Sequence, residues 1–158
     1  IDVILDAAKR LVLTKGIRGL VIDPWNELEH VRKNGQTETE YISVALKRIR
    51  QFGRKYGIHI WVVAHPAKMY RDVKGKLPIP TLYDISGSAR WRDKSDNGIV
   101  IWRDMTPESK GCIVQVHVQK IRFRQDGKNG VEELSYNWRL GTYHLPSRAT
   151  KEIPPTYG

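Results

Sequence analysis

The sequence predicts an α/β domain in which helices flank a mainly parallel sheet and an antiparallel β-hairpin extends the sheet at one edge. Two observations carry this prediction. In the first half of the chain, segments with apolar residues at helical spacing alternate with short segments that are continuously apolar. In the second half, a segment of alternating side chains leads through a glycine-containing turn into a further extended segment.

The first helix and the first strand are predicted from the start of the chain. Residues 2–15 carry apolar residues at helical spacing, and Gly16 favours a helix end because glycine readily adopts the left-handed conformation. Residues 19–23 are an apolar run that ends in Asp23. A run without alternation is expected of a central strand that is covered on both faces.

The second helix and the second strand follow a polar segment. Thr37 and Glu40 have the spacing of a capping box, which predicts a helix that begins there and ends near Gly57. Residues 58–64 are apolar apart from His59, which predicts a buried strand that ends just before His65.

The second half of the chain is predicted to contain a long loop, a third strand and a hairpin. Residues 66–83 hold three prolines and much of the charge, and loops of this length in compact domains are usually functional. The composition of residues 97–103 is typical of a strand. Residues 112–120 alternate apolar and polar side chains, and a turn at 126–130 connects them to an extended partner at 131–138.

Length and composition predict one folded domain at residues 1–143 and an extended tail at residues 144–158. Because the chain begins with Ile1 and not with methionine, we expect it to be a piece of a longer protein. The single cysteine excludes an intramolecular disulfide and fits a reducing cytoplasm. No apolar run approaches the roughly 20 residues of a membrane span, so no membrane partner is expected.

The net charge of +10 is concentrated in three windows. Residues 68–76, 90–94 and 120–128 together hold most of the excess of basic over acidic residues. Clustering of this kind favours a polyanionic partner such as nucleic acid. A generically basic, solvated surface is the alternative that charge by itself leaves open.

Asp23 and His65 are candidate nucleotide-site residues, because each follows an apolar strand. A carboxylate at the carboxyl end of a parallel strand is placed to orient Mg²⁺ on a triphosphate. A histidine at the next strand end can hydrogen-bond a terminal phosphate and report its loss to the loop that follows. A turn aspartate before a proline, and a histidine bonded to neighbouring backbone, are the structural alternatives.

The segment of residues 84–96 is a candidate phosphate-backbone contact. Small residues at 86–89 would let the main chain approach a phosphate chain closely, and Arg90 and Arg92 add positive charge. A capped helix with a solvated basic face is the structural alternative.

Lys120 and Arg122 are candidates for a charge supplied to a neighbouring subunit. They are two residues apart on what we expect to be an edge strand, so both side chains project to one face. Cations on such a face could act on a neighbour's nucleotide as an arginine finger. A second DNA-contacting patch is the alternative.

In this order and spacing, the motifs resemble the C-terminal half of the RecA-like motor of DnaB-type replicative ring helicases. The likeness is greatest to the bacteriophage helicase-primases and the mitochondrial helicase Twinkle, and it covers roughly residues 19–140. Residues 20–23 (LVID) resemble the Walker B strand, and residues 64–68 (AHPAK) resemble the motif whose Gln or His senses the γ-phosphate. Residues 84–96 resemble the family's DNA-contacting motif, and residues 120–123 (KIRF) resemble the Lys and the arginine finger supplied in trans.

The resemblance implies a RecA-like P-loop NTPase core that uses ATP or another nucleoside triphosphate with Mg²⁺. Asp23 would organise Mg²⁺ through water, His65 would sense the phosphate state, and Arg122 with Lys120 would act on the nucleotide of a neighbour. The residues implied to contact single-stranded DNA are Lys68, Arg71, Lys74, Lys76, Ser86, Gly87, Ser88, Arg90 and Arg92. The whole protein would be a hexameric, phage-encoded replicative helicase in the cytoplasm of a bacterial host, with a primase domain or other replisome proteins as partners.

Several residues depart from the family's pattern. Asp93 stands where the family commonly has Gln, Ser86 replaces a basic residue, and residues 24–27 (PWNE) are unusual after the Walker B acid. No G-x-x-x-x-G-K-[ST] phosphate-binding motif occurs in the chain. The family's Walker A lysine and catalytic glutamate would lie upstream of Ile1, so we expect that the chain by itself does not hydrolyse ATP.

Three alternatives stay open at this point. A RecA-like recombinase or clock-type ATPase would share the sheet and Asp23 but would not unwind DNA. A metal-dependent hydrolase or nuclease could use Asp23, His65 and Asp96 as ligands, although no recognised metal-ligand spacing is present. A non-catalytic module that binds single-stranded nucleic acid would need only the basic windows.

Overall fold

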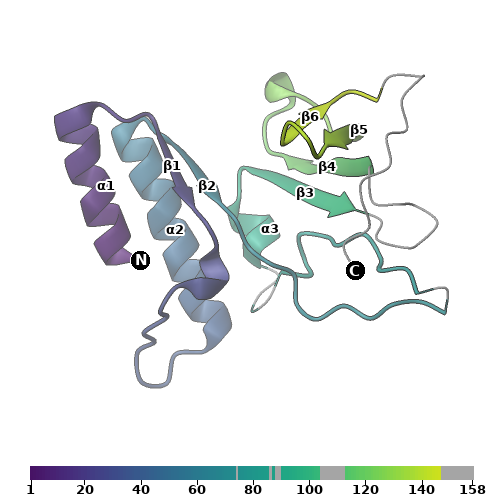
Figure 1. Ribbon diagram of the computed structural model, residues 1–158. Coiled ribbons are helices and arrows are strands. Elements are labelled where there is room, and N and C mark those ends of the chain that lie inside the picture. The colour runs from purple at the N-terminus through teal and green to yellow at the C-terminus, as the bar shows by residue number, and fades with distance from the viewer. Residues whose placement is uncertain (74, 86, 88–89, 104–112, 147–158) are drawn as a thin grey trace. The chain divides into compact units, whose positions relative to one another are not determined.

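The computed structural model describes residues 1–158 apart from 74, 86, 88–89, 104–112 and 147–158 (Figure 1). The chain packs as two compact units. The first unit comprises Ile1–Ala67 and Tyr83–Ser95, and the second comprises Lys68–Leu82 and Asp96–Gly158. Within the described ranges, no helix has the length and the apolar character that crossing a bilayer requires.

In the first unit the first two helices and the first strand have nearly the predicted bounds, whereas the second strand is shorter than the predicted 58–64. In chain order they are α1 (Asp2–Lys15), β1 (Gly19–Ile22), the 3-10 turn η1 (Trp25–Glu27), α2 (Glu38–Tyr56), β2 (His59–Val62) and α3 (Arg90–Lys94). Gly16 ends α1 and Gly57 ends α2, with left-handed φ angles of 66° and 64°. The capping box is confirmed: Thr37 Oγ1 accepts the Glu40 N–H at 3.3 Å, and Glu40 Oε2 accepts the Thr37 N–H at 3.0 Å.

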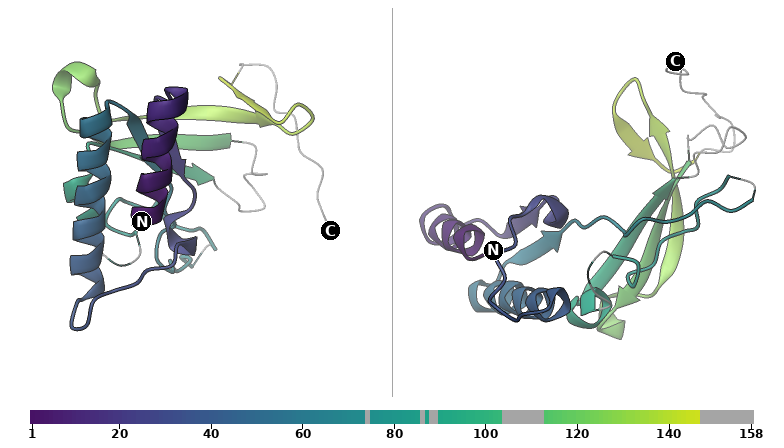
Figure 2. Two further views of the ribbon diagram at one scale, coloured as in Figure 1. Left: turned by 90° about the vertical axis from the view of Figure 1, so that its left-hand side faces the viewer. Right: turned by 90° about the horizontal axis from the view of Figure 1, so that it is seen from below.

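β1 and β2 are parallel neighbours whose register runs from Gly19 opposite His59 to Ile22 opposite Val62. Helices α1 and α2 lie side by side (Figures 1 and 2), and their apolar residues pack with one face of this strand pair. The buried members of this core are Ile22, Trp25, Ile42, Ala45, Leu46, Ile49 and Trp91. The core therefore extends from the helices to η1 and α3, directly beneath the ends of the two strands.

The other face of the strand pair is exposed in the described structure. Val21 is 62% exposed and Trp61 is 51% exposed, whereas Ile22 on the inner face is 4% exposed. The prediction that these strands are covered on both faces is therefore wrong for the described residues. Side chains alternate between the faces of a strand, and the helices of this unit cover only one of them.

The second unit is built on an antiparallel sheet in the order β3-β4-β5-β6. Its elements are β3 (Asn97–Arg103), β4 (Ile113–Ile121), the 3-10 turn η2 (Arg124–Asp126), β5 (Gly130–Asn137) and β6 (Thr142–His144). The predicted third strand and hairpin are confirmed, and so is the combination of a parallel sheet, helices and an antiparallel extension. Among the described residues the antiparallel part is the larger, and β6 escapes prediction because three residues are too few to show a period.

β4 is an inner strand from Ile113 to Val118, so the expectation of an edge strand is wrong for that stretch, but Lys120 is paired on one side only and Arg122 lies just beyond the strand. β3 pairs with β4 on one side, and β5 pairs with it on the other from Ile113 to Val118. Beyond Val118 the pairing with β3 continues, with Lys120 opposite Gly98. The two cations therefore lie past the stretch that β5 covers.

The predicted loop of residues 66–83 has no helix or strand in its described part, and Pro66 forms an isolated bridge with Ile85. Its last residues are fixed to the sheet by Gln119, whose Nε2 donates to Pro80 O at 2.8 Å and whose Oε1 accepts the Leu82 N–H at 3.0 Å. Leu82 is 6% exposed and packs on Gly98, where a Cβ would overlap the leucine side chain. The end of the loop is therefore part of the packed second unit.

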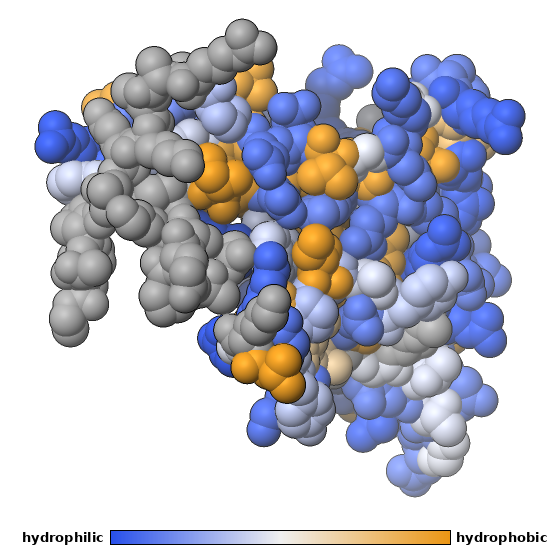
Figure 3. Space-filling view, turned by 90° about the vertical axis from the view of Figure 1, so that its right-hand side faces the viewer, coloured by the Kyte–Doolittle hydropathy of each residue, from blue (hydrophilic) through white to orange (hydrophobic). Residues whose placement is uncertain are grey.

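The surface drawn in Figure 3 is mainly hydrophilic, with apolar residues in separate groups among polar ones. Apolar residues scattered in this way are normal on a protein surface and do not by themselves indicate a binding site.

Candidate nucleotide site and nucleic-acid interface

Asp23 and His65 lie at the same edge of the parallel strand pair. Asp23 directly follows Ile22, the last residue of β1, and His65 lies three residues beyond Val62, the last residue of β2. Because the two strands are parallel and end opposite each other, both residues emerge at the carboxyl edge, where sheets of this kind bind ligands. Both residues are exposed. The structure thus places these two candidates together on neighbouring strand ends.

The turn η1 links the two strand ends by hydrogen bonds. The Val63 N–H donates to Ile22 O at 2.9 Å, and the Trp25 N–H donates to Val63 O at 2.7 Å. One step further, the side-chain Oδ1 of Asn26 accepts the His65 N–H at 2.7 Å. The bonding between the strands therefore continues past their ends and positions the backbone that carries Asp23 and His65.

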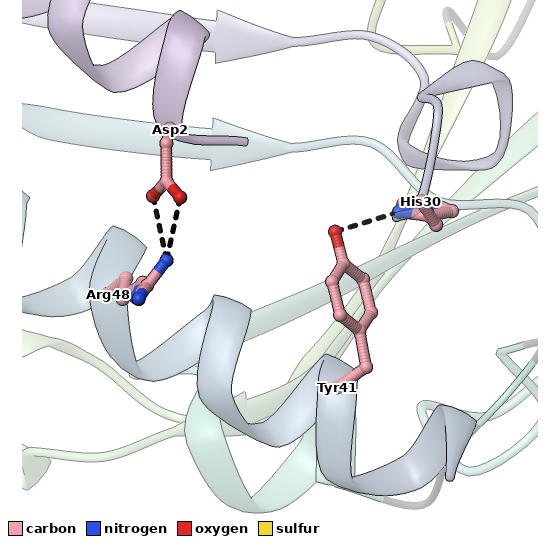
Figure 4. A network of polar contacts seen from close by, with 4 residues as sticks. All are labelled: Asp2, His30, Tyr41 and Arg48. Atoms are coloured by element: carbon pink, nitrogen blue, oxygen red, sulfur yellow. Dashed lines mark hydrogen bonds and ion pairs between the residues drawn. The ribbon is translucent and has the colours of Figure 1, made fainter. Parts of the chain in front are cut away.

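His30 holds the same turn from the side of α2. Its Nε2 lies 3.1 Å from Trp25 O, and its Nδ1 lies 3.3 Å from the Tyr41 hydroxyl (Figure 4). Because a carbonyl oxygen only accepts, Nε2 carries a proton, and Nδ1 of the neutral ring accepts from the tyrosine. Burial raises the pKa of Tyr41 above its ordinary value of 10.0, with a smaller effect from the charge of Asp2. The hydroxyl therefore keeps its proton at neutral pH.

An ion pair joins α1 to α2 on the same side of the unit. Arg48 Nη1 lies 2.8 Å from both carboxylate oxygens of Asp2 (Figure 4). The two side chains are 50% and 69% exposed, so the pair contributes about 0–1 kcal/mol.

α3 carries two of the predicted DNA-contacting arginines and one core residue. Arg90 is exposed and lies 3.5 Å from Asp93, and the Arg92 guanidinium lies 5.4 Å from the centre of the Tyr83 ring. Trp91 between them is 5% exposed, and its ring meets the ring of Trp25 edge to face at 5.2 Å. The short helix is thus anchored by its tryptophan, which fixes where the two arginines emerge.

Gly87 is a glycine for a structural reason. Its φ of 91° is left-handed, and a Cβ there would lie 2.5 Å from Ile42 Cδ1 and 2.6 Å from Glu38 Oε1. Its carbonyl accepts from Thr39 Oγ1 at 3.3 Å. The close approach that the glycine permits in this structure is to the first turns of α2. Its approach to a phosphate chain stays a prediction.

The described basic residues of the loop are exposed, and two of them, Arg71 and Lys76, also have contacts within the second unit. Arg71 Nη1 donates to Gly75 O at 2.6 Å, and the Lys76 ammonium lies 5.1 Å from the centre of the Trp102 ring. Lys68 is exposed. Three further candidates, Lys74, Ser86 and Ser88, lie outside the described residues.

Arg122 forms an ion pair with Asp96 inside the second unit. Its Nε lies 2.6 Å from Asp96 Oδ1, and its main-chain N–H donates to Asp96 O at 2.9 Å. The side chains of Arg122 and Asp96 are 28% and 37% exposed, so the pair is partly buried. Asp96, which the nuclease alternative needs as a metal ligand, thus has a cationic partner here.

A magnesium ion fits the exposed carboxylate of Asp23. Mg²⁺ keeps several of its waters and is commonly held by one or two carboxylates together with substrate phosphates. Among the described residues, no group of three or more His, Cys, Asp or Glu side chains is arranged to hold a metal ion. The strand edge therefore suits a metal that arrives with a nucleotide better than a self-contained metal centre.

Trp25, Asn26 and His30 organise this edge and have no role in the sequence prediction. Residues 24–27 are marked by the sequence only as an unusual segment, and this is the one signal that points to the first two. His30 lies in a polar segment without periodicity, so nothing in the sequence distinguishes it. A pocket of about 310 Å³ beside the turn is lined by Trp25, Asn26, His30, Arg32, Glu38, Tyr41 and Ile42.

Comparison with known proteins gives a relative in sequence and several solved structures of similar fold. No protein-family model matches the sequence. The chain is 46% identical over 163 residues to the Twinkle homolog protein, chloroplastic/mitochondrial, of Arabidopsis thaliana, covering 99% of this chain and 22% of that protein. It therefore spans less than a quarter of the length of this curated relative.

The solved structures share the fold. One of them, an ATPase domain, superposes with a TM-score of 0.69 at 17% identity, covering 92% of this chain and 51% of that one. A DnaB-like replicative helicase, studied with its interactions with primase, superposes with a TM-score of 0.65 at 22% identity, covering 90% and 34%. The sequence and the fold agree with the resemblance drawn from the motifs, and the chain is a RecA-like segment of the DnaB-type helicase family, related to Twinkle.

Proposed function

We propose that the full-length protein is an ATP-dependent replicative helicase that translocates on single-stranded DNA and unwinds the duplex ahead of it. The observation that carries this proposal is the shared strand edge: Asp23 and His65 follow parallel neighbours, and η1 ties the two strand ends together. A single rigid edge that presents a carboxylate and an imidazole suits a nucleotide whose terminal phosphate is gained and lost.

In this scheme Asp23 orients Mg²⁺ and His65 contacts the terminal phosphate. Bound Mg²⁺ would neutralise negative charge that develops on the phosphates during transfer. The Walker A lysine and the catalytic glutamate would come from parts of the protein that this chain does not contain. We therefore expect no hydrolysis by the 158-residue chain alone.

Arg122, with Lys120, would act on the nucleotide of the neighbouring subunit in a hexameric ring. Support comes from the ion pair with Asp96, which holds Nε of Arg122 in place just beyond the end of β4. An arginine supplied in trans accelerates phosphoryl transfer by about 10³–10⁵. The DNA strand would contact Lys68, Lys74, Lys76 and the arginines of α3.

The cellular setting is a further part of the proposal. A phage-encoded protein would work in the bacterial cytoplasm, with a primase domain or another replisome protein as its partner. The plant relative is named for the chloroplast and the mitochondrion, so the compartment stays a prediction.

The first test is ATP hydrolysis by the full-length protein with and without single-stranded DNA. We expect strong stimulation by DNA, and we expect Asp23→Asn to abolish hydrolysis while leaving single-strand binding in place. Asp6→Asn, an exposed aspartate on α1, is the matched control and should behave as wild type. Hydrolysis that is stimulated by DNA without strand unwinding would favour the recombinase alternative, and hydrolysis that survives Asp23→Asn would remove Asp23 from the site.

The trans role of Arg122 is tested by mixing subunits. Arg122→Ala and Asp23→Asn should each be inactive alone. Mixed rings, however, contain interfaces that join an intact Asp23 to an intact Arg122, so hydrolysis should reappear. Mixtures that stay as inactive as the separate variants would overturn the assignment of Arg122 to a neighbour's nucleotide.

The DNA contacts are tested by salt dependence. Each phosphate contact removed from a single strand should lower the slope of log affinity against log salt by about 0.7. Lys68→Gln and Lys76→Gln should each show this change, whereas Lys47→Gln on α2 should not. Unchanged slopes in both loop variants would exclude these side chains from phosphate contact.

A further inference from the structure

The segment after Asp23 contacts both the phosphate-sensing edge and the helix of the DNA-contacting motif. Asn26 Oδ1 accepts the His65 N–H at 2.7 Å, and the Trp25 N–H donates to Val63 O at 2.7 Å. These two bonds hold the main chain on both sides of Ala64. A displacement of His65 toward or away from a phosphate therefore moves or breaks the bond to Asn26.

The next residue back along the turn faces α3. Trp25 is 3% exposed, and its ring stands perpendicular to the ring of Trp91 with 5.2 Å between the centroids. Trp91 lies between Arg90 and Arg92, so a shift of its ring shifts the helix that carries both arginines. Closely packed rings transmit displacement because the interior has little empty volume to absorb it.

The other contacts of Trp25 keep the turn attached to α2. His30 Nε2 lies 3.1 Å from Trp25 O, and the ring of His30 lies 4.7 Å from that of Trp25. Tyr41, in the first turns of α2, bonds to the other nitrogen of His30 at 3.3 Å. These contacts hold η1 to α2, while Asn26 and Trp25 of the same turn contact His65 and Trp91.

We propose that Asn26 is a positioning residue for His65, and that Trp25 and Trp91 link this position to the DNA-contacting arginines of α3. The inference rests on the proposed function, because it assigns the link between the nucleotide and the DNA sites of that function. It assigns a positioning role to the segment of residues 24–27, which departs from the family's pattern. Loss of the link should uncouple hydrolysis from DNA without removing either site.

The test compares Asn26→Leu with Asn26→Asp in the full-length protein. Leucine has the same branching and the same number of heavy atoms as asparagine but cannot accept the His65 N–H, whereas aspartate keeps an oxygen at that place. We expect Asn26→Leu to lower the stimulation of kcat by single-stranded DNA by about 2- to 30-fold, the range that residues along such a link produce. The rate of hydrolysis without DNA should change much less in Asn26→Leu. The conservative variant Asn26→Asp should keep most of the stimulation by DNA. Asn34→Leu, on an exposed turn, is the matched control.

A binding measurement provides the readout that a merely structural role would not move. The ratio of the single-strand Kd with ADP to that with a non-hydrolysable ATP analogue measures the coupling directly, and linkage requires the same coupling in the reverse direction. Asn26→Leu should bring this ratio toward one. Combining it with Trp91→Phe should give less than the product of the two separate effects, because both changes interrupt the same link.

The outcomes separate this inference from the proposed function. If the wild-type protein shows neither stimulation by DNA nor a nucleotide-dependent Kd, the proposed function itself fails. If the wild type shows both and Asn26→Leu retains both, the inference is overturned and the function stands. Multiplicative effects of Asn26→Leu and Trp91→Phe would also overturn it, because the two residues would then act independently.

Discussion

Replacing Gly87 by alanine tests whether this glycine serves the fold or the DNA. Two separate costs follow from the structure. The left-handed φ of 91° costs a residue with a Cβ about 1–2 kcal/mol. The new methyl group would also lie 2.5 Å from Ile42 Cδ1, a side chain that is 2% exposed, and overpacking of a core typically costs about 1–3 kcal/mol. We expect Gly87→Ala to lower the free energy of unfolding by about 2–5 kcal/mol.

Gly35→Ala is the matched control for the backbone term. Gly35 has a φ of 78° in the same unit, and a Cβ there would have no neighbour within 4 Å. The free energy of unfolding of Gly35→Ala should fall by only about 1–2 kcal/mol. The difference between the two variants therefore isolates the contact of residue 87 with α2.

The assay is urea unfolding of the 158-residue chain, followed by single-strand binding of the full-length variants. Equal losses of stability in the two variants would refute the packing argument. A Gly87→Ala protein of unchanged stability that no longer binds DNA would show that the glycine is there for the phosphate chain. The packing argument instead expects that restoring stability, for example at low temperature, restores binding.

Three further predictions concern α2 and the ion pair of the second unit. Hydrogen bonds from the main chain and then the side chain of Thr37 lower the pKa of Glu40 below its ordinary value of 4.5. The capping carboxylate therefore stabilises the fold above pH 4.5, and this stabilisation is lost as the pH falls through the lowered pKa. Unfolding followed from pH 6 to 3 should show this loss in the wild type and not in Glu40→Gln. Ile42→Ala should lower the free energy of unfolding by about 2–5 kcal/mol and Ile42→Val by about 0.5–1.5 kcal/mol, since the side chain is fully enclosed; a loss under 1 kcal/mol for alanine would mean that the core is not packed as described. Asp96→Asn should lower the free energy of unfolding by about 1–3 kcal/mol, between the values for exposed and buried ion pairs. Through its effect on Arg122 it should also reduce DNA-stimulated hydrolysis, while single-strand affinity stays within twofold (~0.4 kcal/mol). Equal loss of hydrolysis and of DNA binding would contradict a role confined to the arginine.

The elements of the fold were predictable because their signals are local. The capping box of Thr37 and Glu40 lies within four residues of chain, and Gly16 and Gly57 act at the helix ends where they stand. The hairpin of β4 and β5 is likewise predicted by an alternating segment and a turn that follow each other directly in the chain. Wherever the determining interactions are between near neighbours in the chain, the pattern of residue types is sufficient.

The errors of prediction have a common origin in partners that are distant in the chain. An apolar run looks the same whether one face or both faces of a strand are covered, so the exposure of Val21 and Trp61 could not be foreseen. The same holds for β4, whose place inside the sheet depends on which strands pair with it. Neither the pairing of a strand nor the burial of its faces can be deduced from the residues of that strand alone.

The sequence by itself determined the class of this protein: two apolar strands that end in Asp23 and His65, the basic windows, and the order of motifs typical of DnaB-type helicases. Only the tertiary structure decided how the candidate site is held together. Asn26 reaches a main-chain N–H 39 residues away, and Trp25 meets Trp91 across a still longer separation. Residue type reports what a side chain can do, but such contacts arise from packing and main-chain geometry, which exist only once the chain has folded.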